Sequence, residues 1–486
     1  MNSRHFLLFV YILFSSQQLI AQPEMKRELR GAWVATVANI DWPKNRNASS
    51  GDQIKELIEI FDKLKDAGIN SIFFQIRTEC DALYNSPYEP WSYWLTGSQG
   101  SEPNPYYDPL EFAIAEAHKR GMELHAWFNP YRAEKKVGDY PLSPQHVVTR
   151  RPEWILDFPG YKMLDPGNPA VREYIREIVA DVVTRYDVDG IHFDDYFYPY
   201  SPKVSNEDSL SFARYHNNIK DVDDWRRYSI NTLMAELNEI IKAVKPRVKF
   251  GISPFGIVLN EYAGTSGFNS YDILYCDPLS WIENKTVDYV LPQLYWEVGH
   301  EKADYAKLLP WWSQVTKDVH LYIGEYSGRF ANANFKGNKS ELGDHLRMTR
   351  TFNNVQGSVY FSSSSITRNA QGIADSMKND WFAEPAFPPL MPWKDMVPPN
   401  APKNMKSEKT ERGLLVTWEA PDPAADGEEP FGYIIYRKLK NSDADFSITR
   451  IITGKNRRFM DQSAEDDPAL YDYKIAAFDR MYNISK

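Results

Sequence analysis

The chain has 486 residues, of which 43% are hydrophobic and 25% charged, and its formal net charge is −10 at pH 7. This length suffices for two or more domains, and the acidic balance excludes a typical nucleic-acid partner, which requires clustered Lys and Arg. The two cysteines, Cys80 and Cys276, exclude a disulfide scaffold and a four-thiolate zinc site, and leave open whether they pair. Aromatic residues make up 14% of the chain, and such rings commonly stack on flat apolar ligand faces.

Residues 1–22 start with a short polar segment carrying Arg4 and continue with an apolar run from Phe6 to Phe14. Because this run is too short to cross a bilayer comfortably and Ala21 offers a small residue for cleavage, the pattern predicts a secretory signal peptide. An uncleaved membrane anchor is the alternative. We therefore expect export to the periplasm or the cell surface, without stable membrane insertion once the signal peptide is removed.

Residues 28–385 alternate short apolar runs with amphipathic segments, an order typical of parallel β/α units. Strands are expected at residues 30–37, 70–77, 122–129, 189–194, 248–253, 287–296, 319–326 and 357–363. Helices are expected at residues 52–68, 108–120, 170–186, 222–244, 302–316 and 340–353. Eight β/α repeats predict an α/β fold, a (β/α)8 TIM-like barrel with enlarged loops.

Residues 386–400 are rich in proline and predict a semi-rigid linker. Residues 401–486 return to alternating patterns, and they predict a small all-β sandwich with strands at 413–421, 431–438, 447–453 and 470–479. This region resembles a fibronectin type III module in the PPNAP segment at its entry, in Trp418, and in the segments GYIIYRK and YDYKIAAFD.

In a barrel of this class the functional residues lie at the C-terminal ends of the strands. The expected ends gather carboxylates, amides and aromatic rings, which is the mixture that a sugar site requires. Polar groups bind hydroxyls, rings pack on apolar sugar faces, and paired carboxylic acids protonate a leaving oxygen while stabilising positive charge. The predicted substrate-binding residues are Trp33, Arg77, Asp81, Trp127, Asn129, Tyr131, His192, Gln293, Tyr295 and Trp296. For each of them a purely structural role is the alternative.

Two adjacent carboxylates, Asp194 and Asp195, follow the fourth expected strand in the segment VDGIHFDDYFYP. Since two like charges in an aromatic-walled cleft do not both ionise easily, one pKa should rise, as a general acid at neutral pH requires. We predict Asp195 as the catalytic acid/base and Asp194 as the orienting or nucleophilic group. Glu297, after the sixth strand, is the second candidate for the proton donor. Alternatively, one aspartate only holds Arg77 or His192 in place.

The roles of Arg77 and of the histidines at the strand ends are open to more than one interpretation. Arg77 could position a carboxylate, which on a cell-wall glycan would be the lactyl group of muramic acid, or it could be a scaffold residue tied to Glu79 or Asp81. His125 and His192 are not followed by a closely spaced His/Asp triad, so we expect no catalytic metal and no cofactor.

From about residue 28 to 340 the chain resembles the glycosyl hydrolase-like 10 family in four segments: ELRGAWVATVANIDWP, FQIRTECDALYNSPYEPWS, YDPLEFAIAEAHKRGMELHAWFNPYR and VDGIHFDDYFYP. The resemblance implies a (β/α)8 barrel in a secreted or cell-envelope protein, with glycoside hydrolysis as the activity. In some members it implies action on bacterial cell-wall glycan.

The segment DGIHFDDY is also similar, more loosely, to the fourth strands of two other groups of barrel glycosidases. In those that act on 2-acetamido sugars, one carboxylate orients the acetamido group, whose oxygen attacks the anomeric carbon, while the neighbouring carboxyl protonates the leaving oxygen. In α-amylase-like barrels the aspartate that ends this strand is the nucleophile, and an acid on another strand protonates. Asp194 with Glu297 or Glu325 would suit the second scheme.

We therefore predict an exported glycoside hydrolase that cleaves O-glycosidic bonds of a polysaccharide, with a peptidoglycan-type glycan of the bacterial cell envelope as its partner. The alternative is a catalytically inactive carbohydrate-binding or envelope-organising protein that keeps the cleft. Deacetylation of the same glycan is a third possibility, and this reaction normally needs a metal.

Overall fold

The computed structural model describes residues 24–332, 335–442, 444–464 and 470–486. The predicted signal peptide therefore lies outside the described residues. Among the helices of the described part, none combines the length and the apolar character needed to cross a membrane. Cys80 and Cys276 are both buried free thiols.

Eight parallel strands close into a barrel in the order β10-β11-β12-β2-β3-β4-β8-β9, which confirms the predicted fold class. Their bounds are β2 Leu29–Val34, β3 Ser71–Arg77, β4 Glu123–Phe128, β8 Gly190–Phe193, β9 Lys249–Ile252, β10 Tyr289–Val290, β11 His320–Tyr326 and β12 Val355–Phe361. Nearly every residue of β2, β3, β4, β8 and β9 is buried, because helices cover the outside and side chains fill the inside.

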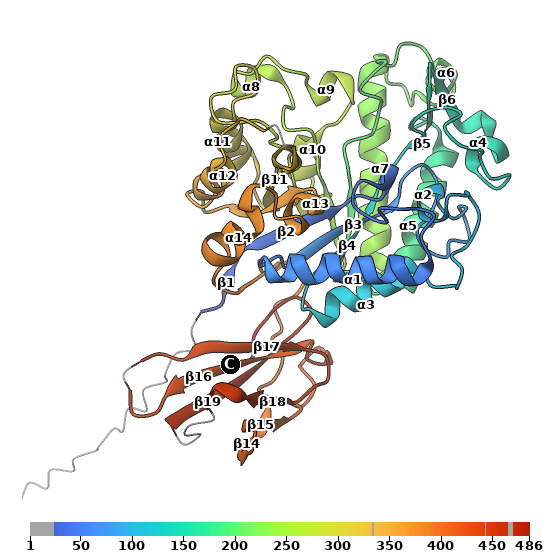
Figure 1. Cartoon of the computed structure of the whole chain (residues 1–486). Coiled ribbons are helices and arrows are strands. Elements are labelled where there is room, and N and C mark those ends of the chain that lie inside the picture. The colour runs from blue at the N-terminus through green and yellow to red at the C-terminus, as the bar shows by residue number, and fades with distance from the viewer. Residues whose placement is uncertain (1–23, 333–334, 443, 465–469) are drawn as a thin grey trace, which may run out of the picture.

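Helices follow the strands and form the outer layer of the barrel (Figure 1). The main ones are α1 Ser50–Asp66, α3 Pro109–Lys119, α5 Pro169–Arg185, α7 Val222–Val244, α10 Pro278–Glu283, α11 Tyr305–Val315 and α12 Glu341–Thr349, with the short α13 Ser363–Thr367 and α14 Ile373–Ser376 after β12. Helix α1 illustrates their construction. The Ser49 side chain caps its first turn by accepting from Asp52 N, and Leu57, Phe61 and Leu64 form its buried face.

Two parts of the barrel differ from the expectation. The sixth strand, expected over 287–296, is only Tyr289–Val290, because Pro292 lacks an N–H and the chain beyond it keeps isolated bridges at Gln293. The loop after β4 contains an additional antiparallel sheet of β5 Arg132–Glu134, β7 Tyr161–Leu164 and β6 Ile155–Phe158. This sheet lies on the same side of the barrel as the loops that follow the strands (Figure 1).

The C-terminal part consists of two antiparallel three-stranded sheets with a shared apolar core that includes Val416, Trp418, Tyr433 and Ile435. One sheet has the order β14-β15-β18 and the other β17-β16-β19. Their bounds are β14 Lys403–Thr410, β15 Gly413–Glu419, β16 Gly432–Leu439, β17 Ser447–Thr453, β18 Arg458–Asp461 and β19 Tyr471–Phe478.

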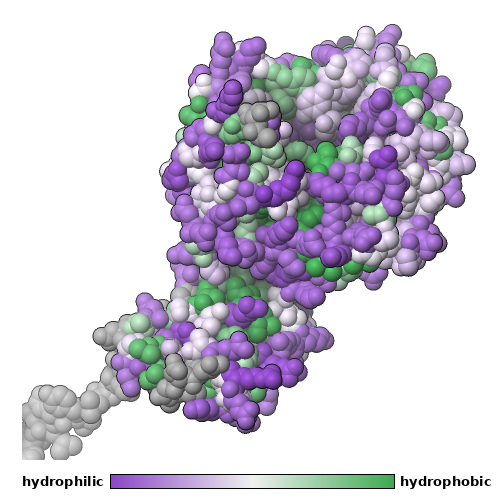
Figure 2. Space-filling view, in the orientation of Figure 1, coloured by the Kyte–Doolittle hydropathy of each residue, from purple (hydrophilic) through white to green (hydrophobic). Residues whose placement is uncertain are grey.

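The C-terminal sheets pack against the end of the barrel where the strands begin. Strand β1, Lys26–Arg27, pairs in parallel with β13, Ala386–Phe387, at this junction. Met391 and Met481 pack into the apolar cluster that fills the barrel interior. Hydrophobic residues gather where the two parts meet (Figure 2). The C-terminal sheets thus lie at the opposite end from the loops that follow the strands (Figure 1).

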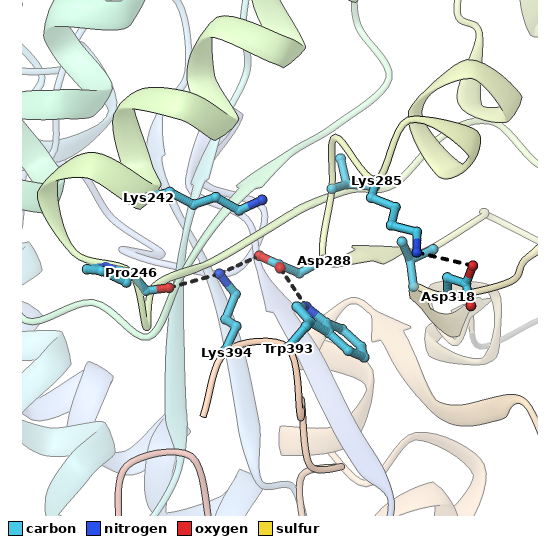
Figure 3. Close-up of a pocket in the computed structure, with 9 residues that line it drawn as sticks. Lys242, Pro246, Lys285, Asp288, Asp318, Trp393 and Lys394 are labelled. Atoms are coloured by element: carbon cyan, nitrogen blue, oxygen red, sulfur yellow. Dashed lines mark hydrogen bonds and ion pairs between the residues drawn. The ribbon is translucent and has the colours of Figure 1, made fainter. Parts of the chain in front are cut away.

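A cavity of about 510 Å³ lies at this lower end, between α7, β10, β11 and the segment after the barrel. Its charged groups are largely paired with one another (Figure 3): Lys394 contacts Asp288 at 2.9 Å, Lys285 contacts Asp318 at 3.3 Å, and the Trp393 indole N–H also donates to Asp288. None of the predicted site residues lines this cavity. It therefore belongs to the attachment of the C-terminal part and not to the predicted site.

Candidate active site

Asp194 and Asp195 follow β8 directly and lie at the C-terminal end of the barrel. Neighbouring side chains that are themselves half-buried, such as Tyr196 and Tyr200, cover them. Asp194 is 5% exposed and Asp195 1% exposed. Neither carboxylate contacts Arg77 or His192 among its hydrogen bonds. The arrangement therefore does not favour the alternative in which one aspartate only holds one of these two residues.

Donors from the neighbouring strand β4 and from the residue just after it fix Asp194. The Trp127 indole N–H donates to its Oδ2 at 2.9 Å, and the Asn129 amide donates to the same oxygen at 3.2 Å. Burial raises the pKa of Asp194 to about 6, and the nearby positive charge of Arg132 and these hydrogen bonds limit the rise. A carboxylate that keeps such donors is suited to stay ionised near neutral pH.

Asp195 has fewer donors and a higher pKa. The hydroxyl of Tyr200 donates to its Oδ2 in a short hydrogen bond. Burial raises the pKa of Asp195 to about 7, Tyr200 and Gln293 oppose the rise by hydrogen bonding, and the charge of Asp194 adds to it. The expected rise of one pKa in the pair thus becomes a rise of both, because burial raises both values and the like charge of Asp194 adds only to the rise of Asp195.

Aromatic side chains from six loops and strand ends surround the pair. Tyr295 lies close to Tyr326 and Phe361, with ring centroids 5.4 and 6.3 Å away, and Phe361 in turn contacts Trp33. On the side of Asp195 a second group of rings in mutual contact consists of Tyr196, Tyr200, Phe255, Phe268 and Trp296. Such rings provide the apolar surfaces on which pyranose faces pack.

Several predicted binding residues are engaged with the protein itself, and Arg77, Asp81 and Tyr131 show this most clearly. Arg77 is buried, and its guanidinium is bound by Glu89 at 2.7 Å and by the carbonyl of Asn129 at 2.6 Å. Asp81 accepts hydrogen bonds from the Thr78 hydroxyl and from backbone N–H groups of its own turn, and Tyr131 is completely buried. Of the two roles kept open for Arg77, this geometry favours the scaffold, although its partner is Glu89 and not Glu79 or Asp81.

His192 lies one layer below the aspartates, inside the barrel. Trp33 Nε1 donates to its Nε2 at 3.3 Å, and the hydroxyls of Ser253 and Tyr289 are also within hydrogen-bonding distance of its ring. Burial lowers the pKa of His192 well below its usual value, so the ring is neutral. Its Nε2 accepts the Trp33 indole N–H and so fixes the position of that ring.

The expectation that the site holds no catalytic metal stays a prediction. A group of carboxylates close enough to hold a cation, Asp395, Asp426 and Glu428, lies at the other end of the barrel.

The two glutamates considered as proton donors lie in contrasting places. The side chain of Glu297 is 52% exposed on the rim and contacts Arg329 at 3.4 Å. Glu325 is buried, and Tyr305 and His345 bind its carboxylate at 2.7 and 2.9 Å. Glu325 is therefore occupied by structural partners, and Glu297 remains accessible but lacks the burial that raises the pKa of Asp195.

Comparison with known proteins adds family membership to this geometry. Residues 28–339 match the family model described as glycosyl hydrolase-like 10. The chain belongs to the glycosyl hydrolase-like 10 family. It is 38% identical to "Glycosyl hydrolase YngK" of Bacillus subtilis (strain 168) over 487 residues, which cover 97% of this chain and 94% of that protein.

The glycosyl hydrolase-like 10 domain has further relatives of similar identity. "Glycosyl hydrolase DigH" of Escherichia coli (strain K12) is 38% identical over 324 residues, or 62% of this chain and 73% of that protein. Among solved structures, the catalytic domain of β-amylase from Paenibacillus polymyxa matches with a TM-score of 0.49 and 9% identity over 75% of this chain and all of that chain.

Several residues around the aspartates in the glycosyl hydrolase-like 10 domain were not among the predicted site residues. Tyr200 lies in the loop after β8, five residues beyond Asp195, and Arg132 and Tyr161 belong to the additional sheet in the loop after β4. Phe361 ends β12. Phe361 could have been predicted, because it is the last residue of a barrel strand. Residues that reach the site from within a loop could not, because no regular spacing in the sequence marks them.

Proposed function

We propose that this protein is a glycoside hydrolase that cleaves O-glycosidic bonds of a bacterial cell-envelope glycan with 2-acetamido sugars, and that it is exported to the periplasm or the cell surface. The observation that carries the proposal is the pair Asp194 and Asp195, buried among aromatic rings, with pKa values raised to about 6 and about 7. Membership of the glycosyl hydrolase-like 10 family and the signal-peptide pattern of residues 1–22 support it.

In the proposed reaction, the protonated Asp195 gives its proton to the glycosidic oxygen as the bond between that oxygen and the anomeric carbon breaks. Asp194, held ionised by Trp127 and Asn129, either attacks the anomeric carbon or orients the 2-acetamido group whose oxygen attacks it. Water then attacks the same carbon, which breaks its bond to the Asp194 oxygen or to the acetamido oxygen, and Asp195 takes the proton of the water. Each proton and each bond is thereby accounted for by the two carboxyl groups and the substrate.

Digestion of purified sacculi and of chitin-like oligomers by the purified protein tests this proposal. We expect new reducing ends. The summed mass of the products should exceed the mass of the substrate by one water for each bond that is cut. Release of acetate without reducing ends would instead indicate deacetylation. Binding of the glycan without any product would indicate the non-catalytic carbohydrate-binding protein.

A further inference from the structure

Arg132 begins β5, and its charge acts on Asp194, although no step of the proposed reaction uses it. Its side chain is nearly buried, with 4% exposure of the residue. Its Nε donates to the carbonyl of Thr78 at 3.1 Å, and its guanidinium lies 5.0 Å from the ring centre of Tyr196. Within the described part of the chain, its two terminal nitrogens have neither a hydrogen-bond partner nor a carboxylate within 4.0 Å.

Two tyrosine hydroxyls accompany this guanidinium. Tyr161 of β7 and Tyr196 are half-buried, and neither hydroxyl has a hydrogen-bond partner among the described residues. Burial raises the pKa of both tyrosines, and the charge of Arg132 opposes the rise in both. Strands β5 and β7, which carry Arg132 and Tyr161, pair with each other, and the charge of Asp194 acts on both residues, so the two tyrosines and Arg132 form a cluster near the aspartate pair.

The free donors of this cluster match one chemical group. A guanidinium presents two parallel N–H groups that bind a carboxylate in a bidentate manner, and a nearly buried site strengthens such a contact. Tyrosine hydroxyls can donate to the same anion. The charges of Glu79 and Asp194 already act on Arg132, but a neutral sugar would offer its terminal N–H groups no charged acceptor in a site that water reaches poorly.

We propose that Arg132, with the hydroxyls of Tyr161 and Tyr196, forms a subsite for a carboxylate carried by a sugar unit next to the bond that is cleaved. This inference rests on the proposed function, and in a peptidoglycan-type glycan the group is the 3-O-lactyl carboxylate. Arg132 thus takes the role for which Arg77 was considered, since Glu89 already occupies the guanidinium of Arg77.

A matched pair of substrates tests the subsite. One is an alternating 2-acetamido glycan with free lactyl carboxylates, and the other is the same glycan after conversion of these carboxylates to neutral methylamides. We expect the wild type to prefer the acidic form about 10- to 100-fold in kcat/KM, as suits a charge-assisted bidentate contact. Arg132→Gln should reduce this ratio to about one. A glycan that alternates uronic acid with a 2-acetamido sugar shows whether a carboxylate on the ring serves equally well.

Arg132→Lys is the control for charge without the guanidinium fork. Because Arg132 lowers the pKa of Asp194, Arg132→Gln should also shift the acid limb of the pH profile of kcat/KM to higher pH. Arg132→Lys should leave this limb at its wild-type pH, since the charge is kept, and should lose most of the preference for the acidic glycan. A residue with only a structural role would change the rates on both substrates equally and leave their ratio intact.

Failure of the inference is distinguishable from failure of the proposed function. Equal cleavage of both glycans by the wild type, or an unchanged ratio in Arg132→Gln, would overturn the subsite and leave the hydrolase in place. Cleavage of neither glycan would overturn the hydrolase. In that case affinity electrophoresis of Asp195→Asn in gels with either glycan still decides the subsite, which requires tighter binding of the acidic form.

Discussion

Asp195 and Asp194 set the expected pH dependence of the proposed reaction. Asp195 must be protonated to act as the acid, and burial raises its pKa to about 7. Asp194 must be ionised, and its pKa is about 6. We therefore predict that kcat/KM passes through a narrow maximum between pH 6 and 7 and falls on both sides. Initial rates from pH 4.5 to 9 measure this profile, and a plateau across that range would contradict the assignment.

The same burial makes Asp195 unfavourable for stability at alkaline pH. Its pKa in the folded state lies above that of an unfolded chain, so its contribution to stability is fully present only below about pH 3, declines as the pH rises from about 4, and is lost by about pH 7. We predict that Asp195→Asn, which keeps an acceptor for Tyr200, is more stable than the wild type by roughly 2 kcal/mol at pH 8. Thermal unfolding at pH 4 and pH 8 tests this, since the advantage of the variant should be small at pH 4 and should grow as the pH rises to 7.

At the scale of elements, the end of β3 is joined to the following loop by the buried ion pair of Arg77 and Glu89. Arg77→Met leaves the Glu89 carboxylate buried without its partner, and we predict a loss of roughly 3 to 5 kcal/mol in stability. The double variant Arg77→Met/Glu89→Leu should regain part of this loss. Denaturant unfolding measures both. If Arg77→Met kept wild-type stability but lost glycan affinity, Arg77 would be a substrate ligand after all.

The barrel strands could be predicted because they are buried on both faces and read as nearly continuous apolar runs. Strand β14, with the sequence KNMKSEKT, is exposed along almost its whole length and offers no alternation, so its place depends only on its pairing with β15. The short strands β5, β6 and β7 escaped prediction for a related reason. Each has only three or four residues, and their pairing depends on the path of a long loop.

The candidate site shows the same division. Asp194 and Asp195 could be predicted because they end an apolar strand, and the barrel brings strand ends together. The partners that adjust their pKa values, Tyr200 and Arg132, come from loops whose course the local sequence does not specify. Arg77 was placed at the rim by the same rule for strand ends, but its side chain turns to Glu89 because a buried guanidinium requires a carboxylate partner.

At the scale of the whole molecule, the C-terminal sheets close the end of the barrel opposite the site. Arg480 binds Asp187 at 3.0 Å and Asp189, just before β8, at 2.8 Å, while Met481 packs into the barrel interior. Although burial opposes it, Arg480 and His118 hold the pKa of Asp189 well below its usual value. The C-terminal part is thus attached at the beginning of the strand that carries Asp194 and Asp195.

We predict that Arg480→Gln lowers the stability of the protein by roughly 3 kcal/mol, because Asp189 loses a partner in a nearly buried place. The kcat/KM of the folded variant should equal that of the wild type, since Arg480 lies at the other end of the barrel. Thermal unfolding and initial rates below the unfolding transition check both statements. A large loss of kcat/KM at full stability would show that the C-terminal part contributes to the site.

The most direct test of the whole account compares the rates of glycan cleavage by the wild type, Asp195→Asn and Glu297→Gln on the same substrate at pH 6.5. We predict that Asp195→Asn reduces the rate by about 10³-fold and still binds the glycan, because general acid catalysis contributes on the order of 10² to 10⁴. Glu297→Gln should stay within about tenfold of the wild type, since the carboxylate is half-exposed and paired with Arg329. Loss of cleavage in Glu297→Gln together with near-normal rates in Asp195→Asn would contradict the assignment of the chemistry to the buried pair.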